Sequence, residues 1–105
     1  MTISRSKYGN VRVKVDGYTF DSKKESKRYA ELKLLEKTGR IRGVLVHPDW
    51  EIEVQGKTIC RYEADFAYRD CGKLIIEDVK GVRTEAYKIK KKLMKAVYGI
   101  DILET

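Results

Sequence analysis

The sequence contains few of the residues that mark zinc-binding, secreted or multi-domain proteins. Its cysteines are Cys60 and Cys71, which are too few and too poorly spaced for a zinc site. No apolar run is long enough for a signal peptide or a membrane span, so we expect a cytoplasmic protein with reduced thiols and no membrane partner. With one proline, no repeats and no low-complexity tract, residues 1–105 are expected to form a single domain.

Basic residues outnumber acidic residues. Lysine and arginine total 23 against 16 aspartates and glutamates, which gives a formal net charge of +7. This excess suggests a polyanionic partner, of which nucleic acid is the commonest, although a simple role in solubility explains the charge equally well. Because 37% of the residues are charged, little apolar material is left for a deep small-molecule pocket. A surface that acts on a large partner is therefore favoured.

The N-terminal part of the chain predicts a β-hairpin. Alternating apolar residues over 11–15 and 18–20 flank the dipeptide Asp16-Gly17, which is typical of hairpin turns. Residues 1–7 are polar and are expected to be frayed.

A helix is expected next, over about residues 23–37. Ser22 followed three residues later by Glu25 is a capping-box pattern, and Gly39 should end the helix. The expected buried face consists of Tyr29, Leu32 and Leu35.

The rest of the chain carries strand signals, then a helix and a last strand. Strands are expected over residues 43–46, 50–55, 58–68, 73–80 and 100–103. The strands over 58–68 and 73–80 should form a hairpin that turns at Arg69–Gly72. Thr84 can cap a helix over about 85–98, whose apolar face is expected to consist of Ala86, Ile89, Leu93 and Ala96/Val97. This order predicts an α/β fold, a mixed sheet with helices packed on it.

Two aspartates lie where acidity is unfavourable, inside predicted strands. Asp65 lies among aromatic residues and Asp78 follows an apolar run, and a buried, unpaired carboxylate is costly. Strand alternation places Asp78 and Lys80 on one face. The expected hairpin sets Asp65 roughly opposite Ile76 and diagonal to Asp78. Two close carboxylates repel unless a cation lies between them, and such oxygen ligands suit Mg²⁺ or Mn²⁺. By itself an Asp-x-Lys pattern is more often a surface salt bridge.

Asp65, twelve intervening residues and then Asp78-Val79-Lys80 resemble the PD-(D/E)XK nuclease superfamily, which has a restriction-endonuclease-like fold. The expected order of elements over residues 20–103 is similar to the αβββαβ core of that superfamily, here preceded by an N-terminal β-hairpin. The runs YGNVRVKVDGYTFDSKKESKRYAEL, YEADF, DVKG and YKIKKKLM also resemble small phage-encoded proteins described as endonucleases or junction resolvases. That resemblance implies the cytoplasm of a bacterial host.

The resemblance implies a role for each matching residue. Asp65 and Asp78 would be metal ligands, with the backbone carbonyl of Val79 as a third. Lys80 would be the catalytic lysine. Glu25 matches a glutamate that many members carry on the first core helix, facing the metal site, and its alternative role is helix capping alone. Asp65 follows alanine where the motif name has proline, and Asp78 is shorter than the more frequent glutamate.

Several other polar residues have expected roles. Glu77 should face away from Asp78 and pair with a helix, and His47 should be structural in its turn. Positive charge at the start of the helix over 23–37 opposes the helix dipole, so contact with phosphate would explain the basic residues there. For the lysines of the helix over 85–98, the alternative is a solvated helix face. The residues expected to contact nucleic acid are Lys23, Lys24, Lys27, Arg28, Lys88 and Lys90.

Together these expectations describe a metal-dependent DNA endonuclease with Mg²⁺ or Mn²⁺ as its cofactor. So short a chain has few elements for reading sequence, so structure-selective cutting of Holliday junctions or other branched DNA in phage recombination, repair or processing is favoured. A homodimer would supply two cuts. The alternatives are a non-catalytic nucleic-acid-binding module that keeps the fold, and a structural phage protein with surface salt bridges.

Overall fold

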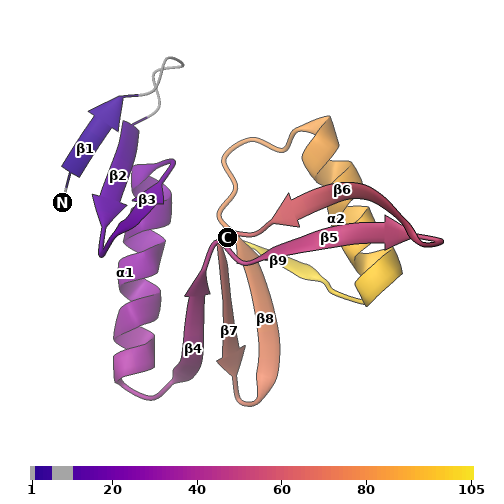
Figure 1. Cartoon of the computed structure of the whole chain (residues 1–105). Helices are drawn as coiled ribbons and strands as arrows, with labels where there is room; N and C mark the ends of the chain where they lie inside the picture. Colours follow the sequence, from indigo (N-terminus) through magenta and orange to yellow (C-terminus); the bar gives the residue numbers. More distant parts are fainter. Residues whose placement is uncertain (1, 6–10) are drawn as a thin grey trace.

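The computed structural model describes residues 2–5 and 11–105 (Figure 1). Its elements along the chain are β1 (Thr2–Arg5), β2 (Val11–Val15), β3 (Tyr18–Phe20), α1 (Lys23–Lys37), β4 (Ile41–Val46), β5 (Asp49–Val54), β6 (Lys57–Glu63), β7 (Phe66–Asp70), β8 (Lys73–Asp78), α2 (Glu85–Tyr98) and β9 (Ile102–Glu104). The architecture is α/β with a mixed sheet and two helices, as the sequence predicts.

The expected N-terminal hairpin is part of a three-stranded antiparallel sheet in the order β1-β2-β3. Asp16 and Gly17 turn the chain with φ angles of 53° and 82°, the left-handed region that a tight hairpin turn requires. Thr2–Arg5 form a strand that pairs along β2, so the expectation that they are frayed is wrong. Residues 1, 6 and 7, which were also expected to be frayed, lie outside the described residues.

Helix α1 has the predicted bounds because its end signals are local in sequence. The Glu25 backbone N–H donates to Ser22 Oγ at 3.1 Å. The second half of the capping box differs, since Glu25 Oε2 accepts a hydrogen bond from the backbone N–H of Asp21 at 2.8 Å. Gly39 follows the helix with a φ of 83°.

The central sheet has the strand order β4-β7-β8-β9, in which β9 runs parallel to β8 and the other pairs are antiparallel. The expected single strand over 58–68 is wrong, because the chain breaks it at Ala64-Asp65. β6 pairs with β5 in a separate ribbon of two strands, whereas β7 joins the central sheet. Long-range backbone hydrogen bonds stabilise this interruption between β6 and β7. The Ala64 N–H donates to the Pro48 carbonyl, and the His47 N–H donates to the Asp65 carbonyl.

Strand alternation on β7 divides the core between two faces of the sheet. Phe66 and Tyr68 pack in the cluster that includes residues of α1, whereas Ala67 packs in the cluster that includes residues of α2. Buried members of the first cluster also include Phe20, Tyr29, Leu32, Ile41 and Val79, and those of the second include Ile52, Tyr62, Ala64, Ile76, Tyr87, Met94 and Ile102. Helices on opposite faces of one sheet make the expected layered α/β arrangement.

The buried face of α2 includes Leu93, as predicted, but is centred on other residues. Its bounds, its Thr84 cap and its end at Gly99 are as expected, but Tyr87 and Met94 are its buried residues. Ile89, expected in the core, is 58% exposed. The helix turns Tyr87 and Met94 inward because the β5–β6 ribbon, which only the fold creates, offers Ile52 as a packing partner. Within the described residues, neither α1 nor α2 combines the length and the hydropathy needed to cross a membrane.

Candidate metal centre

The predicted acidic residues meet where β8 ends and where the chain returns from the ribbon to the central sheet. β7 and β8 pair with Phe66 opposite Glu77, so continuing the register by one residue sets Asp65 opposite Asp78. The expectation that Asp65 lies opposite Ile76 is therefore wrong by two residues. The cause is the turn, which has two residues rather than four and in which the non-glycine Cys71 takes a φ of 52°.

Asp65 is held by the segment that follows β8. Its Oδ2 accepts a hydrogen bond from the backbone N–H of Val79 at 2.7 Å. Burial, followed by the nearby carboxylate of Glu25, raises the pKa of Asp65 to about 7. Asp65 is therefore a carboxylate that is costly to ionise in the protein alone, and a cation beside it would remove that cost.

Asp78 is almost fully buried and has two polar partners. Its Oδ2 accepts a hydrogen bond from the hydroxyl of Tyr62, on the ribbon strand β6. Its Oδ1 lies 3.5 Å from Lys80 Nζ, which confirms that the two side chains share a face. Burial raises the pKa of Asp78 to about 6, partly offset by the Tyr62 hydrogen bond and further raised by Asp65. Burial and the Asp78 carboxylate also raise the pKa of Tyr62.

Lys80 is fixed at both its backbone and its ammonium group. Its backbone N–H donates to the Thr105 carbonyl at 3.1 Å, and its own carbonyl accepts from Lys24 Nζ at 3.2 Å. Its Nζ lies 4.0 Å from the centre of the Tyr87 ring, a cation–π contact with the first turn of α2. The ammonium group thus stays beside Asp78.

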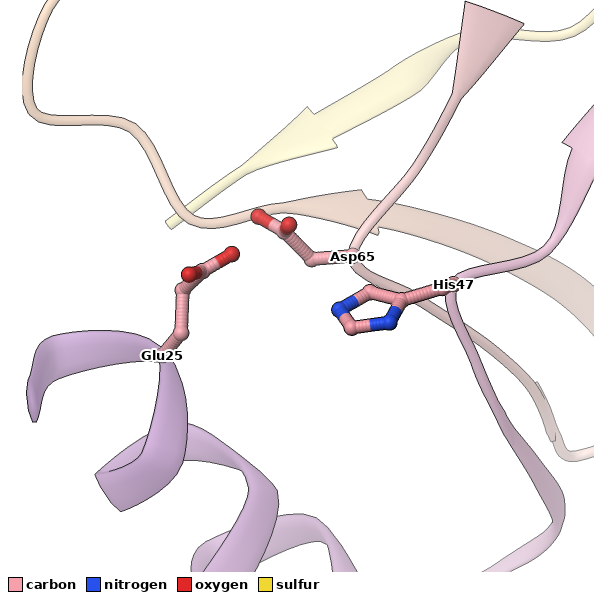
Figure 2. A group of neighbouring side chains, drawn as sticks. All are labelled: Glu25, His47 and Asp65. Atoms are coloured by element: carbon pink, nitrogen blue, oxygen red, sulfur yellow. The ribbon is translucent and has the colours of Figure 1, made fainter. Parts of the chain in front are cut away.

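A three-residue group of potential metal ligands lies beside these carboxylates. One ligand atom from each of Glu25, His47 and Asp65 lies within 4.8 Å of the other two. Figure 2 shows the three side chains converging, Glu25 from α1, His47 from the end of β4 and Asp65 from the segment before β7. The expected position of Glu25 near the metal site is in agreement with this arrangement. Asp78 stays outside this group and contacts Tyr62 and Lys80 instead.

Sequence reasoning treated His47 as structural and missed its place in this group. His47 lies 18 residues from Asp65 in the chain, and the two meet only because the His47 N–H donates to the Asp65 carbonyl at 3.0 Å. No local signal in the sequence marks His47 as a site residue. Only the structure shows that it takes a φ of 55°, which an L-residue rarely adopts, at the point where β4 gives way to the ribbon.

Glu77 forms the salt bridge expected of it, on the opposite face from Asp78. Its side chain is fully buried, and Arg28 Nε and Nη2 donate to its two oxygens at 2.7 and 2.9 Å. The hydroxyls of Tyr68 and Thr105 complete its hydrogen bonding. Arg28, expected to contact nucleic acid, is therefore engaged in an internal ion pair.

Basic residues line two cavities near Lys80. One of about 280 Å³ is lined by residues that include Lys24, Lys27 and Arg28 of α1. The other, of about 300 Å³, is lined by residues that include Arg61, Lys80 and Lys90. Lys23 is exposed at the start of α1. Lys88 instead lines a separate cavity of about 530 Å³ between α2 and β9, so Lys90 but not Lys88 shares a cavity with Lys80.

Comparison with known proteins assigns the chain to a family. Residues 5–102 match the family described as "Protein of unknown function (DUF1064)", and the chain belongs to that family. No curated protein and no solved structure matches the chain.

Proposed function

We propose that this protein is a metal-dependent nuclease that hydrolyses phosphodiester bonds in DNA. The observation that carries the proposal is the meeting of Asp65, Asp78 and Lys80 at one edge of the sheet, with Glu25 facing them from α1. A lysine and several carboxylates in a partly buried site suit phosphoryl chemistry, because each group has a distinct task there.

The topology supports the same proposal. Without the β5–β6 ribbon, the order α1, β4, β7, β8, α2, β9 follows the αβββαβ arrangement of the restriction-endonuclease-like fold, with the last strand parallel to its neighbour. In this proposal the ribbon is an insertion between the first two core strands, and it supplies Tyr62, which binds Asp78.

The donor set fits a divalent cation. Asp65, Asp78, Glu25 and the Val79 carbonyl are the groups that would hold Mg²⁺ or Mn²⁺, and burial raises the pKa of both aspartates, so a bound cation would stabilise their ionised forms. A bound ion would supply Lewis-acid polarisation of the phosphate and of a water molecule.

The other residues would position the reactants. The ammonium group of Lys80 would orient the attacking water and stabilise negative charge on the phosphate. Tyr62 would hold Asp78 in its orientation through the hydroxyl bond. The basic residues that line the two cavities near Lys80 would bind phosphates of the DNA backbone near the scissile bond.

Branched DNA is the proposed substrate. The chain has few elements that could read a base sequence, so it would select a DNA structure such as a junction, a flap or an end, and a homodimer would cut two strands. A non-catalytic DNA-binding module is the second candidate. Buried carboxylates beside the proposed phosphate path disfavour it, because a binder would gain affinity by losing them.

The test is incubation of the purified protein with four-way junctions, flaps, linear duplexes and single strands, in Mg²⁺, Mn²⁺ or chelator. We expect cleavage of at least one branched substrate that needs the metal and is lost in the Asp78→Asn variant purified in the same way. Absence of metal-dependent cleavage on every substrate would overturn the proposal. Binding that weakens with salt, without any cleavage, would establish the binding module instead.

A further inference from the structure

We infer that His47 is a metal ligand and that the site it completes with Glu25 and Asp65 selects a first-row transition ion such as Mn²⁺ over Mg²⁺. The inference deepens the proposed function, since it concerns the same site, but it depends on metal binding and not on catalysis. It rests on the placement of three side chains from three separate segments (Figure 2).

The backbone of His47 fixes where its ring lies. Its N–H donates to the Asp65 carbonyl at 3.0 Å, and the next residue, Pro48, accepts from Ala64 N–H at 2.9 Å. These two hydrogen bonds join the segment that follows β4 to the segment that precedes β7. The ring centre also lies 5.8 Å from that of Phe20. The imidazole is therefore positioned by the fold beside the carboxylate of Asp65.

The two carboxylates of the group are oriented in the same way. Glu25 Oε2 accepts from Asp21 N–H at 2.8 Å, and Asp65 Oδ2 accepts from Val79 N–H at 2.7 Å. Within residues 2–5 and 11–105, each carboxylate accepts one backbone N–H, and the Glu25 and Asp65 carboxylates also lie against each other, an arrangement that a cation between them would stabilise. Each carboxylate thus has one oxygen held by the backbone and one oxygen available to an ion, as in metal sites whose ligands are oriented by outer contacts.

The separation of the ligand atoms suits an ion. Two ligands bound at about 2.1 Å from one cation are at most about 4.2 Å apart. The three atoms lie within 4.8 Å of one another, so small rotations of the side chains bring them into coordination distance. A set of three oxygens would leave the choice of ion open, but an imidazole nitrogen favours Mn²⁺, Co²⁺ or Zn²⁺ over Mg²⁺, which prefers oxygen ligands and retains water.

His47 is the one histidine of the chain, which makes its ligation directly observable. Bound Mn²⁺ is paramagnetic, so electron spin-echo envelope modulation detects the ¹⁴N nucleus of a coordinated imidazole. The experiment uses the full, tag-free chain with Mn²⁺ in a buffer without imidazole, and a parallel titration measures the Kd for Mn²⁺ and for Mg²⁺.

The matched variant is His47→Asn. Asparagine tolerates the left-handed backbone of residue 47, so the variant removes the imidazole without straining the turn. We expect imidazole ¹⁴N coupling in the wild type and none in the variant. The Kd for Mn²⁺ should rise at least about 10-fold, while the Kd for Mg²⁺ should change by less than about threefold.

Mn²⁺ bound without imidazole coupling, or failure to bind Mn²⁺ at millimolar concentration, would overturn the inference. This experiment can fail independently of the test of the proposed function. DNA cleavage without ¹⁴N coupling would retain the nuclease and reject the His47 ligand, whereas ¹⁴N coupling without cleavage would retain the metal site and reject the nuclease.

Discussion

At the scale of single residues, the buried carboxylates differ in how their charge is compensated. Glu77 has both oxygens bound by the Arg28 guanidinium, so its burial is structural. Asp78 has a hydroxyl and a more distant ammonium group, and Asp65 has a single backbone N–H. Burial raises the pKa of both Asp65 and Asp78, and their partners compensate their charge only in part. The residues with partial compensation are those proposed to bind a cation.

The Glu77→Gln variant should lose stability because it removes the fully buried counter-charge that binds two nitrogen atoms of the Arg28 guanidinium. Breaking a buried pair from one side costs on the order of 3–5 kcal/mol of unfolding free energy, measurable by urea denaturation. Glu31→Gln is the control, since Glu31 also contacts Arg28 at 3.1 Å but is half exposed. Its effect should be below about 1 kcal/mol. Equal losses in the two variants would contradict the structural role of Glu77.

Stability without metal should fall as the pH rises from about 4 to about 7. Asp65 has a folded-state pKa of about 7, above its ordinary value of 3.8, so the folded state binds more protons than the unfolded state in that window. The stabilisation is complete below pH 4 and is lost through pH 7. Each such proton contributes a slope of up to about 1.4 kcal/mol per pH unit. Urea midpoints in chelator should show a shallower slope for Asp65→Asn, and an unchanged slope would contradict the shift.

The sequence singled out those residues of the candidate site that are unusual in their local sequence context. Asp65 and Asp78 were recognisable as carboxylates in apolar strands, Lys80 from its alternation with Asp78, and Glu25 from its position on the helix. His47 was not recognisable as a site residue, because its contact with Asp65 depends on a pairing of two distant chain segments.

At the scale of elements, local signals predicted both helices correctly. The strand expected over 58–68 was mispredicted because its division depends on long-range pairing. Both helices begin and end where their caps indicate, because a cap involves residues a few positions apart. The break of the strand over 58–68 depends on hydrogen bonds to residues 47 and 48, which no local pattern reveals. The prediction of the buried face of α2 was wrong at Ile89 for the same reason, since local patterns do not reveal the β5–β6 ribbon that the helix packs against.

Gly99 should be the glycine whose replacement weakens α2. It ends the helix with a φ of 69°, and a Cβ there would meet no atom within 4 Å, so backbone strain alone determines the cost. Gly99→Ala should lower the unfolding free energy by about 1–2 kcal/mol. Gly81→Ala is the matched control, because Gly81 has open space and no left-handed φ. Thermal unfolding midpoints that are equal in the two variants would reject this role.

At the scale of the whole molecule, the net charge is +7, and some of the basic residues behind it line the two cavities near Lys80. Lys90 and Lys88 lie two residues apart on α2 but line different cavities, of which only that of Lys90 includes Lys80. The fold therefore separates two lysines that the sequence had grouped together.

DNA affinity should depend on Lys90 and not on Lys88. Removing one phosphate contact lowers the slope of log K against log salt by about 0.9, so Lys90→Ala should bind more weakly and with a shallower slope. Lys88→Ala should match the wild type in both quantities. Fluorescence anisotropy with a labelled junction at several salt concentrations makes the comparison, and an effect of equal size in both variants would contradict the proposed DNA path.

The most direct test of the nuclease proposal is the single-turnover cleavage rate of the Lys80→Met variant. Methionine keeps the length of the side chain and its packing on Tyr87 but removes the ammonium group that lies 3.5 Å from Asp78. We predict a rate at least about 100-fold below that of the wild type at saturating Mn²⁺ and saturating DNA, where weaker DNA binding no longer limits the rate. A rate within about threefold of the wild type would contradict a catalytic role for Lys80 and, with it, the assignment of this site as a nuclease centre.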